Sequence, residues 1–163
     1  MNHTETHEHE LGYHLAVIHQ PYIDMILDGT KTIESRFTKI KCPPYKKVHT
    51  GDVVYMKKNA GMVLGQFTVA GVETYDNLDC SLICELYRKH FNDIFEGEML
   101  RDKKGNPQPP EKWLASKYAS LIHVEHAIKY TEAINFPKKD GRAWVILKNE
   151  LDIKVAKSYS DNQ

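Results

Sequence analysis

Three charged side chains follow a glycine within one short stretch of the sequence: Lys31, Glu34 and Arg36 come directly after Gly29. Residues two positions apart on a β-strand face the same side, so Glu34 and Arg36 are expected to share a face. Lys31 joins them only if the chain bends just after Gly29, where glycine permits a positive φ. Such a group can hold a polar, hydrogen-bonding ligand at the end of a sheet. The alternative is a solvated edge strand with an ordinary ion pair, which contributes little stability.

The same stretch also admits a catalytic interpretation. Lys31 and Glu34 are then the candidate catalytic residues, and the two cations near Glu34 favour its carboxylate form. A carboxylate suits a general base or a hydrogen-bond acceptor better than a general acid. His19 lies a few residues earlier and is a candidate proton shuttle, although a histidine at a helix start is more often a capping or surface residue.

Charge is distributed unevenly along the chain. Seven basic residues and one acidic residue lie between Arg36 and Lys58, whereas seven acidic and two basic residues lie between Glu73 and Met99. A basic segment can follow a phosphate backbone, and tyrosines can stack on bases. The alternative is that the lysines keep a loop in water and that Tyr22 packs against the protein. The candidate ligand-binding or RNA-binding residues are Lys31, Glu34, Arg36, His19, Tyr22, Lys39, Lys41, Tyr45, Lys46 and Lys47.

The overall composition indicates one globular domain. A chain of 163 residues is long enough for a hydrophobic core, and its 41% hydrophobic and 27% charged residues are ordinary for a soluble protein. Basic and acidic residues balance at 22 each, so no global positive field attracts nucleic acid. No apolar run approaches the roughly 20 residues of a membrane span, and the polar N-terminus is unlike a secretory signal.

The spacing of cysteine and histidine residues matches no metal or disulfide motif. Cys42, Cys80 and Cys84 are an odd number without framework spacing, which favours a reduced, cytoplasmic location. Cys80 and Cys84 lie on one helical stripe, while His123 and His126 lie on a predicted strand, and neither pair has the spacing of a closed zinc site. We therefore expect no metal and no cofactor.

The order of elements predicts how the charged stretch is positioned. Pro21 suits the first turn of a short helix, which Gly29 ends, and the charged strand follows at once. Asp79 or Ser81 can cap a second helix that Gly97 closes. A charged, proline-rich excursion spans residues 101–110, and a further short helix is expected from Glu111 to Tyr118. The other expected strands are residues 13–18, 53–57, 63–73, 121–130 and 143–147.

This pattern predicts an α+β fold: a small, mostly antiparallel β-barrel of five or six strands. It has a short helix after the first strand and a helical insertion around residues 79–118. The His- and Glu-rich residues 1–12 are expected to form a disordered tail. The domain then spans residues 13–153, and residues 154–163 form a polar C-terminal tail.

Several of these segments together resemble the ASCH domain, a branch of the PUA-like β-barrel superfamily. The stretch from Gly29 to Arg36 is similar to the family signature G-x-K-x-x-E-x-R, and Gln20-Pro21-Tyr22 precedes the short helix as in that family. The strand markers downstream are also similar in order and spacing. They are Gly51-Asp52, Gly65-Gln66-Phe67-Thr68-Val69 and Gly141-Arg142-Ala143-Trp144-Val145.

The resemblance, which covers roughly residues 14–148, implies a PUA-like barrel with a cleft beside the signature strand. It also implies binding of RNA or of a small nucleotide-like ligand, because members are proposed to act in RNA metabolism. Some bacterial relatives are amidohydrolases on N4-acetylcytidine, and at least one cleaves single-stranded RNA. The amidohydrolase branch has threonine where this chain has Glu34, and a carboxylate is a poor substitute for an alkoxide nucleophile. Glu73 matches the downstream glutamate of that branch by position only.

Overall fold

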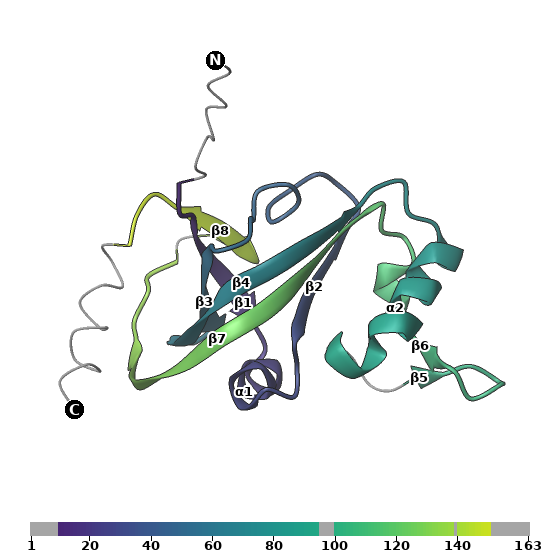
Figure 1. Ribbon diagram of the computed structural model, residues 1–163, viewed down its shortest axis with the longest axis horizontal. Helices are drawn as coiled ribbons and strands as arrows, with labels where there is room; N and C mark the ends of the chain where they lie inside the picture. The colour runs from purple at the N-terminus through teal and green to yellow at the C-terminus, as the bar shows by residue number, and fades with distance from the viewer. Residues whose placement is uncertain (1–9, 95–99, 139, 151–163) are drawn as a thin grey trace, which may run out of the picture.

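The computed structural model describes residues 10–94, 100–138 and 140–150. Its main feature is a curled sheet of six strands in the order β2-β7-β4-β3-β1-β8, with two α-helices and a small hairpin of β5 and β6 (Figure 1). The elements are β1 (Tyr13–Ile18), α1 (Gln20–Asp28), β2 (Ile33–Thr38), β3 (Val53–Lys58), β4 (Val63–Tyr75), α2 (Cys80–Ile94), β5 (Leu100–Arg101), β6 (Pro107–Gln108), η1 (Glu111–Trp113), β7 (Tyr118–Ile134) and β8 (Trp144–Leu147).

The sheet confirms the predicted mostly antiparallel α+β fold and adds one feature. Neighbouring strands are antiparallel except β1 and β3, which run parallel, so the sheet is mixed. It curls into a half-barrel whose two edges are β2 and β8. Most of the two predicted tails, together with the predicted helix end at Gly97, lies outside the described residues, so those predictions are not tested.

Helix α1, which the sequence predicts, packs inside the curl of the sheet. Pro21 stands in its first turn, where the missing backbone N–H has no partner to lose. Ile23 and Ile26 are buried in a core cluster with Phe67 of β4. The helix ends at Gly29, whose φ of 85° is left-handed and costs glycine little. This turn aims the following residues back toward the sheet.

Helix α2 packs on the other side of the sheet, at the β2 end. Asp79 caps it by accepting the backbone N–H of Leu82 at 2.8 Å. Ile83 and Tyr87 are buried in a second core cluster with Leu121 of β7. The two helices therefore cover opposite faces of one sheet.

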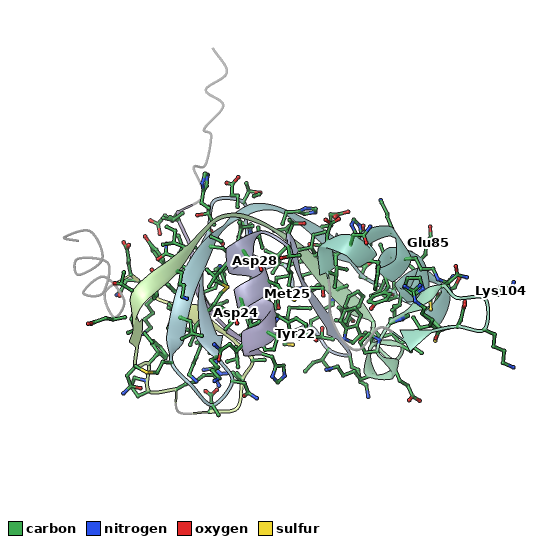
Figure 2. The ribbon with its side chains drawn as sticks, turned by 90° about the horizontal axis from the view of Figure 1, so that it is seen from below. Tyr22, Asp24, Met25, Asp28, Glu85 and Lys104 are labelled. Atoms are coloured by element: carbon green, nitrogen blue, oxygen red, sulfur yellow. The ribbon has the colours of Figure 1, made fainter. Side chains whose placement is uncertain are left out.

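The arrangement of the two ends of the molecule is visible in the view from below (Figure 2). Tyr22, Asp24, Met25 and Asp28 mark α1, which lies near the middle of the molecule. Lys104 marks the tip of the β5–β6 hairpin, which projects at the end where α2 lies. This hairpin is therefore remote from α1.

The connection into β7 contains less helix than the sequence predicts. Instead of a helix from Glu111 to Tyr118, the structure has a single 3-10 turn that ends at Trp113, and Tyr118 already begins β7. The backbone N–H of Lys117 donates to the carbonyl of Thr38 at 2.9 Å. This hydrogen bond draws the chain into the sheet before a second helical turn can form.

Strand β7 is longer than predicted and changes face part of the way along. His126 has a φ of 49°, and the pairing with β4 shifts its register nearby. The alternation that begins with buried Ile122 is therefore interrupted, and Ile128 is exposed rather than buried. Gly65 lies opposite, where a Cβ atom would stand 2.5 Å from the carbonyl oxygen of Ile128, so the two strands approach too closely for a side chain.

Candidate functional site

The predicted convergence of the three charged side chains is confirmed in the structure. The Lys31 ammonium lies 3.6 Å from one carboxylate oxygen of Glu34. The other oxygen accepts the Arg36 Nε–H at 3.0 Å and lies 2.9 Å from Arg36 Nη2. Glu34 therefore lies between two cations, and only 1% of its side chain is exposed. The left-handed turn at Gly29 is what brings Lys31 to this side.

Lys31 is buried beneath the site rather than open to a ligand. Its side chain has no exposed surface, and its ammonium donates to the carbonyls of Ile33, at 2.8 Å, and Ile94. The carboxylate of Glu34 lies 3.6 Å away, which is close enough for an ion pair but too far for a hydrogen bond. Lys31 thus joins β2 to the end of α2, and its complete burial keeps the ammonium away from solvent.

Arg36 spans the gap between the two edges of the half-barrel. Its Nη2 donates to the carbonyl of Val17 on β1 at 3.0 Å, and its Nη1 lies 3.5 Å from the carbonyl of Ala143 just before β8. Its guanidinium carbon lies 5.2 Å from the centroid of the Trp144 ring. The two edges do not pair along their length, and this guanidinium links them at one point.

A cleft of about 720 Å³ opens beside Arg36. Six cations and two carboxylates line it, so its charge is strongly positive. The strands β1 and β2, the β3–β4 turn, the segment around η1 and the residues before β8 all contribute. The charged and aromatic lining residues are Arg36, Lys39, Lys57, Lys112, Lys138, Arg142, Glu34, Asp140, His19, Tyr22, Phe37 and Trp113.

Five of the residues predicted from the sequence line this cleft: His19, Tyr22, Glu34, Arg36 and Lys39. Lys31 contacts Glu34 from below. Other predicted residues lie in the loop between β2 and β3 and do not line the cleft, and these are Lys41, Tyr45, Lys46 and Lys47.

The loop residues have packing roles that the sequence did not predict. Tyr45 is buried, and its ring centroid lies 5.0 Å from that of Tyr118. The ammonium groups of Lys41 and Lys46 lie over the rings of Tyr118 and Tyr45, at 5.8 and 5.5 Å. Tyr45 therefore holds the loop on the sheet and has no open face for a base.

Sequence reasoning missed four of the six cations, namely Lys57, Lys112, Lys138 and Arg142. They come from three segments that are far apart in the chain, and no local pattern links them. The position of Arg142 within the Gly141-Arg142-Ala143 strand marker was the one available signal. The other three become neighbours of Arg36 only when the sheet curls.

An exposed ion pair forms at the rim of the cleft. Arg142 donates to Asp140 through Nε at 3.0 Å, and its Nη2 lies 2.9 Å from the same oxygen. The hydrogen bonds from the Arg142 side chain and backbone lower the pKa of Asp140 to about 2, and the same carboxylate raises the pKa of Arg142. Both side chains are accessible to a ligand entering the cleft.

A second polar cluster lies on the opposite face of the sheet, beneath α2. Glu73 accepts hydrogen bonds from His123 at 2.8 Å and from the Tyr75 hydroxyl at 3.0 Å, and His90 of α2 lies 3.8 Å away. Burial raises the pKa of Glu73, but the hydrogen bonds from His123 and Tyr75 and the nearby His90 outweigh it, so the pKa is lowered.

No three His, Cys, Asp or Glu side chains within residues 10–94, 100–138 and 140–150 gather closely enough to hold a metal ion. In the same part of the chain, no helix has both the length and the apolar character needed to cross a membrane. Cys42, Cys80 and Cys84 are free thiols.

Comparisons with known proteins identify similar folds. Residues 17–136 match the family model of the ASCH domain. The crystal structure of ASCH from Zymomonas mobilis superposes with a TM-score of 0.62 at 13% identity, over 90% of this chain and 94% of that chain. A single-residue variant of the same Zymomonas mobilis protein gives the same TM-score and identity, over 91% and 96%. At this identity the likeness concerns the fold alone. No curated protein matches the chain.

Proposed function

Since the chain belongs to the ASCH domain family, we propose that its cleft binds a single-stranded RNA segment or a nucleotide. The observation that carries this proposal is the excess of six cations over two carboxylates in one cleft of about 720 Å³. The chain as a whole is neutral, so this excess is local. A local positive cleft attracts a polyanion and makes its binding sensitive to salt.

The lining residues divide into groups by their chemistry. Exposed lysine and arginine side chains of the lining suit phosphate oxygens, and Lys39, Lys112 and Arg142 are the clearest examples. Tyr22 and His19 also line the cleft, and their rings can stack on a base. Glu34 lines the cleft, and its Oε2 accepts no hydrogen bond from the described residues. We assign the Glu34 carboxylate as the acceptor for an amino group on the edge of a base.

The basic loop after β2 extends this surface beyond the cleft. Lys39 lines the cleft, and Lys41, Lys46 and Lys47 follow in the same exposed loop. The one acidic residue of this region, Asp52, is buried and hydrogen-bonded to His14 at 2.8 Å. A strand of RNA longer than the cleft can therefore continue over the loop without meeting an exposed carboxylate of this segment.

The hydrolase alternative has less support in the geometry. The ammonium of Lys31 donates to Ile33 and Ile94 and faces Glu34, so it offers neither a nucleophile nor a proton to the cleft. Incubation with N4-acetylcytidine and with labelled single-stranded RNA tests this alternative. Turnover by the wild-type protein that disappears in Glu34→Gln would reverse our ranking of the two functions.

The binding function is tested by filter binding of labelled single-stranded RNA at two salt concentrations. We expect weaker binding at the higher salt concentration. Lys112→Gln should weaken binding and reduce the slope of log affinity against log salt by about one contact. The matched control is Lys104→Gln, which removes an exposed lysine from the remote hairpin (Figure 2) and should bind like wild type. Absence of binding at low salt would reject the proposal.

A further inference from the structure

The N–H groups of Arg36 are largely used within the protein. Nε and Nη2 both face one oxygen of Glu34, at 3.0 and 2.9 Å. Nη2 also donates to the carbonyl of Val17 at 3.0 Å, and Nη1 reaches the carbonyl of Ala143 at 3.5 Å. Hydrogen bonds of a guanidinium lie close to its plane, so these three partners fix the orientation of that plane.

One face of this fixed plane is covered by an aromatic ring. Trp144 is buried, with 3% of its surface exposed, and its ring centroid lies 5.2 Å from the guanidinium carbon. The indole N–H of Trp144 donates to His14 Nδ1 at 3.1 Å, and His14 Nε2 lies 2.8 Å from Asp52. This chain of buried contacts prevents the indole from shifting away from Arg36.

The remaining surface of Arg36 faces the cleft. The side chain is 16% exposed, and it lines the cleft between Glu34 and the segment before β8. Because most of its N–H groups have partners, it has little capacity left to bind phosphate oxygens. A guanidinium with one covered face offers its other face to a planar ring, and bases stack on arginine planes in RNA complexes.

We infer that Arg36, backed by Trp144, is a stacking platform for a planar base, and that the other cations of the cleft contact phosphate. This inference rests on the proposed function and adds a subsite to it. The planar shape of the Arg36 guanidinium then contributes more to RNA binding than its positive charge does. Lys112 and Arg142, which lie at the rim with exposed side chains, depend on charge alone.

The test compares two RNA hexamers, one of uridine and one of 5,6-dihydrouridine. Both carry the same phosphates and the same hydrogen-bonding edge, but the dihydrouridine ring is not planar and stacks poorly. The wild-type protein should bind the uridine hexamer about fivefold or more tightly, the lower end of a base-stacking contribution. Arg36→Lys keeps the positive charge and removes the plane, so it should discriminate between the two hexamers much less than the wild-type protein does.

The salt dependence separates stacking from phosphate binding. Arg36→Lys should leave the slope of log affinity against log salt unchanged, whereas Lys112→Gln should weaken both hexamers equally and lower the slope. If Arg36→Lys weakens both hexamers equally, or still discriminates between them as wild type does, the stacking role is rejected while the binding function stands. If wild type binds neither hexamer at low salt, the proposed function itself fails.

Folding of the variant is checked by near-ultraviolet circular dichroism, because Arg36 also links β1 to β2. If Arg36→Lys does not fold, Trp144→Leu is used instead. It removes the ring that covers one face of the Arg36 guanidinium and should reduce the discrimination between the two hexamers. Trp144→Phe, which keeps a ring behind Arg36, should retain most of it. The preference of the wild-type protein for the uridine hexamer over the dihydrouridine hexamer can be measured without any variant. If this preference is absent, the inference is wrong.

Discussion

Glu34 and Glu73 are two carboxylates on opposite faces of the same sheet. Glu34 pairs with Ile122 in the strand register, and Glu73 pairs with the next residue, Leu121, so their side chains point to opposite sides. Each accepts hydrogen bonds from side chains of its own or a neighbouring strand. Glu34 faces the cleft inside the curl, whereas Glu73 lies under α2.

The partners of the two carboxylates differ in kind. Glu34 is paired with the basic side chains of Lys31 and Arg36, and it is almost fully buried. Glu73 is paired with His123 and Tyr75, and a third of its side chain is exposed. A buried ion-pair cluster is costly to disrupt, whereas the lowered pKa of Glu73 makes its partly exposed cluster respond to pH. We therefore expect the face of the sheet around Glu34 to be rigid and the stability of the face around Glu73 to depend on pH.

The largest effect is expected from Glu34→Ala. It leaves the fully buried ammonium of Lys31 with no counter-charge, and removal of one partner of a buried pair costs about 3–5 kcal/mol of unfolding free energy. Urea unfolding measures the change. The double variant Lys31→Met with Glu34→Ala should be less destabilised than Glu34→Ala alone, because the orphaned charge is gone. A single variant within about 1 kcal/mol of wild type would contradict the buried-cluster interpretation.

A smaller, pH-dependent effect is expected from Glu73→Gln. The pKa of Glu73 is lowered from its ordinary 4.5: burial raises it, but hydrogen bonds from His123 and Tyr75 outweigh burial. A lowered pKa adds stability that is fully present above pH 4.5 and is lost as the pH falls through the folded-state value. The difference from wild type should be about 1 kcal/mol at neutral pH.

Urea unfolding of wild type and Glu73→Gln at several pH values checks this window. The gap between the two proteins should shrink steadily as the solution becomes more acidic than pH 4.5. In a double-mutant cycle with His123→Gln, the two substitutions should be non-additive because the side chains are hydrogen-bonded. If the difference in unfolding free energy between the two proteins stayed constant down to strongly acidic pH, these partners would not be the cause of the lowered pKa of Glu73.

The smallest effect is expected at a third carboxylate, Asp140, whose pair with Arg142 is exposed at the rim of the cleft. Arg142→Gln should lower the unfolding free energy only slightly at neutral pH, since solvent screens an exposed pair. The same change should raise the pKa of Asp140 from about 2 toward its ordinary 3.8, because the hydrogen bonds from the arginine side chain are lost. Carboxyl-carbon NMR titration measures this shift. If the pKa of Asp140 did not change, Arg142 would not be the cause of its low value.

Local features of the fold were predictable from local patterns. Pro21 and Gly29 set the limits of α1, Asp79 capped α2, and the period-two pattern located the long strands. The errors arose where tertiary contacts override local preference. The predicted helix from Glu111 became a single turn because Lys117 is drawn to Thr38, and Ile128 turned outward at the β7 irregularity.

The candidate site was predictable only in part. Lys31, Glu34 and Arg36 lie within six residues, so strand alternation and one glycine turn were enough to bring them together. The sequence could not predict that Lys31 would be enclosed beneath the site. It also could not place Tyr45 in the packing of the loop, because that position depends on Tyr118, 73 residues further along the chain.

The sequence by itself determined the two helices, most strands and the charged group after Gly29, because these depend on backbone preferences and spacing over a few residues. Only the tertiary structure decided which cations gather around Arg36. Lys57, Lys112 and Arg142 come from separate segments, and the curl of the sheet closes them on one cleft. That curl depends on packing of the whole core, and no short stretch of the chain encodes it.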